Sequence, residues 1–172
     1  MHRGSRNKAC LPRQGFGIFE IIIASAIIVG AVVALINILV LSKYTAEFST
    51  QKIQAAFLLE EGVEAVKFIR DTGWNQNIVP LLINTDYYLV FSTSTSVWTI
   101  GSAPIPAIDG IFTRSFRVEH VSRDASSNIE TSYNPANLDL ETKKIIMRVT
   151  WPFKGQNKTA TLETYLVDLF DN

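Results

Sequence analysis

Cysteine and histidine are scarce in this chain. Cys10 is the single cysteine, and His2 and His120 are the two histidines. Zinc sites of ordinary spacing take most of their ligands from these two residue types, so we expect no metal site. Past residue 15 the chain offers no cysteine nucleophile and one histidine, His120, and it contains no nucleophile-elbow motif. We therefore predict that the chain is not an enzyme and binds no cofactor.

Proline and charge are both missing from a long stretch near the N-terminus. No proline occurs between Phe16 and Val79, and the apolar run over residues 21–41 contains no charged residue. Only Ser25, Gly30 and Asn37 interrupt this run. Twenty-one helical residues extend about 30 Å, which is the thickness of a bilayer's hydrocarbon core. The sequence therefore predicts a membrane-spanning helix over residues 16–41.

Acidic residues are absent from the first fifteen positions, whereas basic residues are not. The basic residues there are Arg3, Arg6, Lys8 and Arg13. The positive-inside rule then places the N-terminus in the cytoplasm and the chain after Leu41 outside it. A secretory signal peptide fits poorly, because its apolar stretch has about 7 to 15 residues and its small-x-small cleavage site follows that stretch. Here the only such triplet, residues 24–26, lies near the start of the run.

A carboxylate lies at the start of this apolar run. On insertion scales a charge such as that of Glu20 costs about 2.5 to 3.5 kcal/mol at the bilayer centre and less near the interface, so it needs an explanation: either a positive partner or snorkelling of the carboxylate to the headgroups. Gly15 and Phe16 precede Glu20 at the junction of the basic and apolar segments. This pattern resembles the processing site of type IV pilin-like proteins, in which a basic leader ends in Gly and the mature chain has Phe first and Glu fifth. Gly17 departs from the pattern, because Thr is more usual there.

The resemblance implies a set of partners and modifications. A prepilin peptidase would cut after Gly15 and N-methylate Phe16, so that residues 1–15 form a removable leader. Glu20 would then pair with the N-terminal ammonium of a neighbouring pilin-like subunit and set the register of assembly at an inner-membrane platform. An uncleaved signal anchor is the alternative, but it gives Glu20 no role.

Loss of the leader would also change the charge of the chain. The leader contains four of the sixteen basic residues and none of the sixteen acidic ones, so the mature chain would have a formal charge of −4. We therefore predict no nucleic-acid partner. The small basic clusters, Lys143-Lys144 with Arg148 and Arg114 with Arg117, are interpreted as solvated strand faces.

Small residues recur within the predicted span. Ala26, Gly30 and Ala34 are four residues apart and would share one helix face, which lets neighbouring helices approach closely. The sequence therefore predicts helix packing along this stripe.

Helical periodicity continues beyond the membrane over residues 42–72. Apolar and small residues recur at spacings of three and four, while acidic and basic residues occupy another face. The predicted buried stripe comprises Ala55, Leu58, Leu59, Gly62, Val66 and Ile69. Glu60, Glu61 and Glu64 are interpreted as a solvated helix face rather than a metal cluster. Asp71-Thr72-Gly73 provides a C-terminal stop.

The remaining residues, 73–172, have the composition of a β-rich globular region outside the cytoplasm. Segments rich in β-branched and aromatic residues predict strands over 87–92, 97–100, 112–121, 144–151 and 159–170. Residues 152–158 are predicted to form the turn between the last two. The predicted class is α+β: a long N-terminal helix packed, over residues 53–72, on an antiparallel sheet.

Taken together, these features favour a structural subunit of a type IV pilus, competence or type II secretion filament. The lack of cysteine after position 10 favours a minor pilin or pseudopilin, because many major pilins carry a disulfide-bounded loop. We expect a single-pass membrane protein that later enters a filament or reaches the cell surface. The alternative is a signal-anchored extracellular binding domain that does not polymerise.

Overall fold

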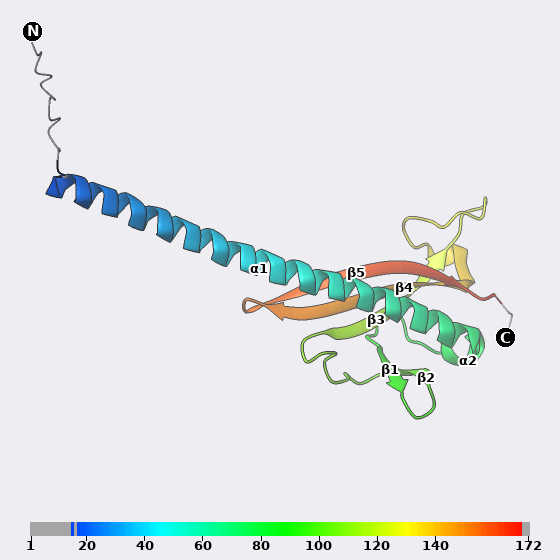
Figure 1. The fold of residues 1–172 in the computed structure, drawn as a ribbon. Coiled ribbons are helices and arrows are strands. Elements are labelled where there is room, and N and C mark those ends of the chain that lie inside the picture. Colours follow the sequence, from blue (N-terminus) through cyan, green and yellow to red (C-terminus); the bar gives the residue numbers. More distant parts are fainter. Residues whose placement is uncertain (1–14, 16, 170–172) are drawn as a thin grey trace, which may run out of the picture. The chain divides into compact units, whose positions relative to one another are not determined.

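The structure is a computed structural model that describes Gly15 and residues 17–169 (Figure 1). It confirms the α+β class, with one long helix followed by antiparallel strands. The helices are α1 (Ile18–Asp71), α2 (Trp74–Asn77) and the 3-10 helix η1 (Pro135–Asn137). The strands are β1 (Tyr88–Ser92), β2 (Val97–Gly101), β3 (Thr113–Ser122), β4 (Leu138–Phe153) and β5 (Gln156–Val167). The chain divides into two compact units, Met1–Ala46 and Glu47–Asn172.

Helix α1 ends where the sequence predicts. The Thr72 amide donates to the Phe68 carbonyl and the Gly73 amide to the Arg70 carbonyl, which satisfies two of the last carbonyls of the helix. The Asn77 side chain and the Thr72 hydroxyl both donate to the Ile69 carbonyl. Gly73 follows with φ of 154°, a conformation that side-chain-bearing residues rarely adopt.

The strands form two sheets rather than the one predicted. β3, β4 and β5 pair in that order as an antiparallel sheet, while β1 and β2 pair only with each other in the part of the chain that the structure describes. A single bridge between Tyr87 and Phe116 links the two sheets. Next to this bridge, Nε and Nη2 of Arg117 donate hydrogen bonds to the two carboxylate oxygens of Asp86, at 2.6 and 2.8 Å.

The boundaries of the last hairpin differ from the prediction. β4 begins at Leu138, six residues before the start of the predicted strand 144–151, and its register with β3 shifts between His120 and Val121. The turn before β5 is only Lys154-Gly155, with φ of 50° and 72°, which is the type I′ geometry that matches strand twist. Pro152 lies within β4. Proline is tolerated there because β3 pairs with β4 only as far as Thr150, leaving one side of β4 open.

The core of Glu47–Asn172 lies between the second half of α1 and the strands. Of the predicted stripe, all but the half-buried Leu58 are buried, and Val63 and Ala65 are buried in addition. Gly62 allows the closest approach: a Cβ added there would lie 2.8 Å from the Met147 sulfur and 3.0 Å from Arg114 Cδ. The predicted burial of Gly62 is therefore confirmed, and it rests on close contacts with Met147 of β4 and Arg114 of β3.

Two of the basic residues are buried, which corrects their interpretation as solvated. Arg114 is 2% exposed; its Nη1 donates to the Leu58 carbonyl at 3.1 Å and lies 3.2 Å from a Glu61 carboxylate oxygen. Lys143 is 6% exposed, with Nζ 3.3 Å from His120 Nδ1. Burial lowers the pKa of both Lys143 and His120.

The contact at Gly62 generates a stability prediction. Gly62→Val should lower the free energy of unfolding by about 1 to 3 kcal/mol, because the added methyl groups overpack a space occupied by Met147 and Arg114. Ala56→Val is the matched control, since Ala56 is exposed on the same helix. Urea unfolding of the full chain in detergent, followed by tryptophan fluorescence, measures both. Equal midpoints for the two variants would contradict the packing described here.

Candidate functional site

The first turn of α1 places Glu20 at a defined position. The Gly17 carbonyl accepts hydrogen bonds from the amides of Glu20 at 3.0 Å and Ile21 at 3.3 Å, so Gly17 is the N-cap and Glu20 the third helical residue. Gly15 and Glu20 are both exposed. Phe16, the predicted first mature residue, lies outside the described residues.

Electrostatics favour a carboxylate at this position. The helix macrodipole puts a partial positive charge on the first turn, and Glu20 is the acidic residue there. Gly17 has no side-chain oxygen, so it cannot cap the free amides as a serine or threonine would. A carboxylate three residues after the N-cap is therefore the group best placed to compensate the charge of the helix end or of a nearby ammonium.

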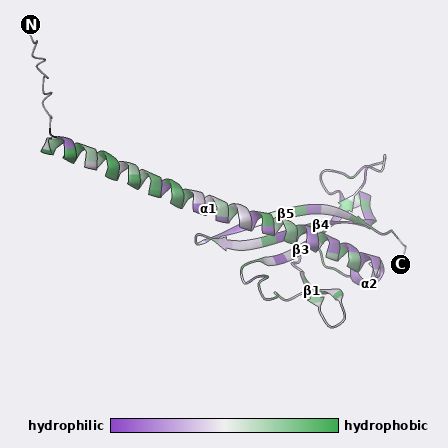
Figure 2. Cartoon of the chain, viewed as in Figure 1, coloured by the Kyte–Doolittle hydropathy of each residue, from purple (hydrophilic) through white to green (hydrophobic). Residues whose placement is uncertain are grey.

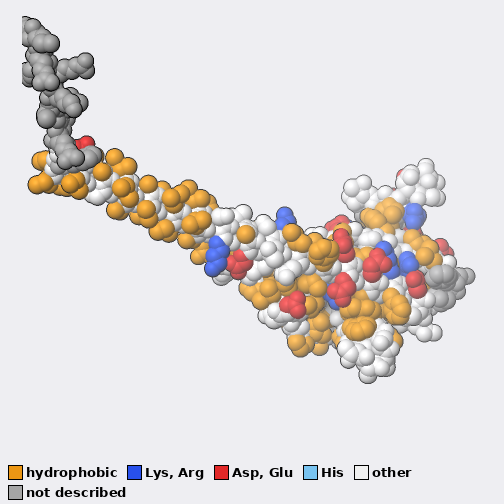
Figure 3. All heavy atoms as spheres, in the orientation of Figure 1, with side chains coloured by type: hydrophobic (Ala, Val, Ile, Leu, Met, Phe, Trp, Pro, Cys, Tyr) orange, Lys and Arg blue, Asp and Glu red, His pale blue; other side chains and the backbone are white. Residues whose placement is uncertain are grey.

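The apolar segment that follows is exposed along its whole described length. Every described residue from Gly17 to Ala46 is exposed, and α1 is long and apolar enough to cross a membrane. Figure 2 shows almost continuous hydrophobic colour along this part of α1, and Figure 3 shows hydrophobic side chains covering the face in view. This segment is consistent with a single-pass membrane protein.

Hydroxyl side chains in and after the span bond to the helix itself. Ser25 Oγ donates to the Ile22 carbonyl at 2.9 Å, and Thr45 Oγ1 donates to the Leu41 carbonyl at 3.0 Å. Hydroxyls satisfied in this way can enter hydrocarbon without leaving an unpaired donor.

The small-residue stripe lies open on α1. Ala26, Gly30 and Ala34 are exposed, and no atom lies within 4 Å of a Cβ added at Gly30. Ala26 is six residues after Glu20, about 9 Å along the helix axis. The structure thus places Glu20 and the stripe on one helix without bringing their side chains together, and a second helix could contact both.

Several charged contacts in Glu47–Asn172 were not identified from the sequence. The hydrogen bond from Arg117 lowers the pKa of Asp86. Arg123 lies 2.6 Å from Asp139, and the ring of His120 stacks on Tyr133. These pairs join residues 13 to 31 positions apart, so no local spacing reveals them. Among the described residues, no group of three metal-ligating side chains comes together.

Comparisons with protein-family models, with curated proteins and with solved structures found no match for this chain.

The exposed span generates a prediction about membrane integration. Replacing Val29 and Val33 together by lysine should reduce the fraction of the chain that resists alkaline extraction, because each charge near the bilayer centre costs about 2.5 to 3.5 kcal/mol. Ile53 and Phe57 provide the matched control, since they are also exposed apolar residues four positions apart on α1. Lysine at both control positions should leave integration unchanged. An equal loss for the two pairs would mean that residues 21–41 are not the membrane segment.

Proposed function

We propose that this chain is a prepilin-like subunit, a minor pilin or pseudopilin, of a type IV pilus, competence or type II secretion filament. The observation that carries this proposal is the position of Glu20, a carboxylate in the first turn of a helix whose next twenty-one residues are exposed, uncharged and almost all apolar. A plain membrane anchor gains nothing from a charge at this point, whereas a subunit that must pair with a neighbour does.

The proposed mechanism begins with cleavage between Gly15 and Phe16 by a prepilin peptidase, followed by N-methylation of Phe16. Cleavage creates an ammonium at the positive end of the helix macrodipole, where a cation is disfavoured. Glu20 of an incoming subunit neutralises the ammonium of the previous one. In a low-dielectric helix bundle such a pair is strong and depends on register.

The exposed apolar surface of residues 21–41 is covered both before and after assembly, by a different partner in each case. Before assembly, lipid covers residues 21–41 of α1, with the N-terminus in the cytoplasm and Glu47–Asn172 outside. On assembly at the inner-membrane platform, helices of neighbouring subunits replace the lipid. Close approach at Ala26, Gly30 and Ala34 then brings backbones within van der Waals contact.

The cleavage step is tested at Gly15. A bulky or charged residue, such as Gly15→Arg, should leave the full-length precursor in the membrane, while Gly15→Ala should be cleaved in part. Gly17→Thr is the control and should be processed normally, because threonine is both usual in the family and a good N-cap. Intact mass spectrometry of the chain, with and without prepilin peptidase, gives the result. A mature protein that does not begin at methylated Phe16 would exclude this proposal and favour the signal-anchored binding domain.

The assembly step is tested at Glu20. Glu20→Val should insert and be cleaved as well as the wild type, because it makes the span more apolar and leaves the peptide bond unchanged. Incorporation into filaments should fall strongly, since an unpaired ammonium in a buried interface costs about 3 to 5 kcal/mol.

Glu60→Val is the matched control, because Glu60 is exposed on the same helix beyond the span. The measurement is the filament fraction of processed protein at matched membrane levels, or filament number per cell for a rare subunit. Normal incorporation of Glu20→Val would reduce Glu20 to an incidental charge.

A further inference from the structure

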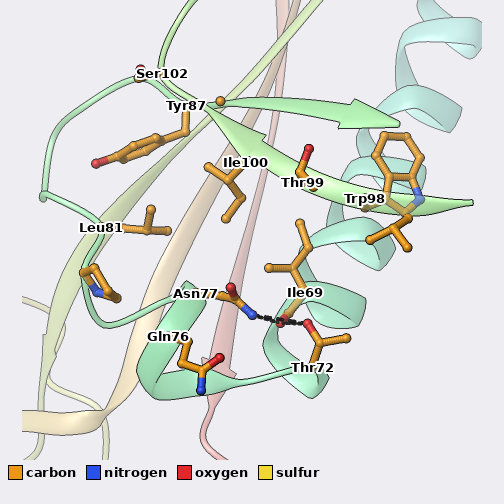
Figure 4. Close-up of a pocket in the computed structure, with 13 residues that line it drawn as sticks. Ile69, Thr72, Gln76, Asn77, Leu81, Tyr87, Trp98, Thr99, Ile100 and Ser102 are labelled. Carbon is orange, nitrogen blue, oxygen red and sulfur yellow. Dashed lines mark hydrogen bonds between the residues drawn. The ribbon is translucent and has the colours of Figure 1, made fainter. Parts of the chain in front are cut away.

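A cavity of about 510 Å³ opens between two parts of Glu47–Asn172 (Figure 4). One wall is β2 with the residue that follows it. The other is the end of α1 together with α2 and the chain just after it. This volume lies within the range of about 300 to 1,000 Å³ that is typical of ligand-binding clefts.

The cavity runs along the edge of β2. Every residue from Val97 to Ser102 lines it. Because alternate residues of a strand point to opposite faces, a cavity that touched one face would be lined by every second residue only. β2 pairs with β1 on one side, and among the described residues no strand pairs with it on the other. Its unpaired amides and carbonyls therefore border the cavity, as on any sheet edge.

The opposite wall presents side-chain amides. Asn77 Nδ2 donates to the Ile69 carbonyl at 3.1 Å and to the Thr72 hydroxyl at 3.2 Å, which leaves the Asn77 side-chain oxygen as an acceptor (Figure 4). The side-chain amide of the neighbouring Gln76 forms no hydrogen bond within the described part of the chain. A side-chain amide offers the same donor and acceptor as a peptide group.

The lining is uncharged and partly apolar. Among the described residues that form the cavity there is no acidic, basic or histidine side chain. Trp98, Ile100 and Leu81 supply the apolar surface, and the Tyr87 hydroxyl already accepts from the Leu82 amide. A phosphate, a carboxylate or a metal ion would find no opposite charge here.

We infer that this cavity binds an extended, uncharged peptide segment of a partner protein, which adds as a strand to the free edge of β2. Such a segment has two hydrogen-bonding edges. One would pair with β2, and the other would meet Gln76 and Asn77, while its alternate side chains would contact Trp98 and Ile100. Five paired residues extend about 17 Å, the length of β2. This inference does not depend on whether the chain enters a filament.

The test uses the full chain in detergent micelles and a defined probe, the acetylated and amidated heptapeptide Ser-Val-Thr-Val-Ser-Val-Thr. At a peptide concentration ten times the Kd, hydrogen exchange at the β2 amides that point away from β1 should slow about ten-fold. A control heptapeptide with proline at its third and fourth positions should not bind, because it lacks a central donor on each of its two edges. Equal binding of the two peptides, or unchanged exchange over Val97–Gly101, would overturn the proposal.

Variants at Gln76 locate the site. Gln76→Ala should weaken binding about 2- to 12-fold, the loss expected for one hydrogen bond. Gln76→Trp should abolish it by filling the cavity mouth. The same changes at Gln54, an exposed glutamine on α1 outside the cavity, should have no effect. A neutral oligosaccharide, probed with maltotetraose, is the competing ligand class. Its binding with altered Trp98 fluorescence, but with no peptide binding and no β2 protection, would replace the peptide proposal.

Discussion

The contact between α1 and the strands at Gly62 is the constraint on which the rest of Glu47–Asn172 depends. A glycine there lets the backbone of α1 approach Met147 of β4, and the same gap admits the buried stem of Arg114 from β3. Arg114 in turn lies 5.2 Å from the centre of the Trp98 ring on β2, so the two-stranded sheet shares this contact region. Because Gly62 has no side chain, α1 lies close to β3 and β4, and Arg114 extends this contact region to β2. Trp98 also lines the cavity beside β2, so the cavity adjoins the same group of residues.

α1 presents two surfaces that require different surroundings. Its residues after position 54 bury a stripe of small and branched side chains against the strands, whereas its described residues before position 47 are wholly exposed and mostly apolar. Burial of apolar area is the main favourable term in folding. Water therefore stabilises the packing of the buried stripe on the strands and disfavours exposure of the apolar residues before position 47. A single helix can satisfy both conditions only if a non-aqueous phase, either lipid or other helices, surrounds its first part. In the proposed function, lipid surrounds this part of α1 before assembly, and the helices of neighbouring subunits surround it in the filament.

The sequence predicted features that depend on local spacing. The length of α1, its stop at Asp71 and the positions of β1, β2 and β3 follow from periodicity and turn residues, and each matches the structure to within a few residues. The burial of Gly62 also follows from this periodicity. The sequence did not predict what depends on distant partners. The split into two sheets arises from pairing choices that no single strand encodes, and the burial of Arg114 and Lys143 reflects a helix carbonyl and a histidine that are far away in sequence. For the candidate site, the order Gly15, Phe16, Glu20 is visible in the sequence alone. The edge of β2 is not, because a free edge is a property of the whole sheet.

The hydrogen bond from Arg114 to the Leu58 carbonyl has a mechanical consequence. Leu58 and Glu61, the two residues of α1 that the guanidinium contacts at 3.1 and 3.2 Å, are three positions apart and so lie about one helical turn from each other. Advancing the helix by a single residue would turn it by about 100° and move it about 1.5 Å, which would displace both the Leu58 carbonyl and the Glu61 carboxylate from the buried guanidinium. The contacts of Arg114 therefore oppose both rotation and sliding of α1 relative to the strands. A displacement of α1 along the strands would therefore break this buried contact as well as the close packing at Gly62.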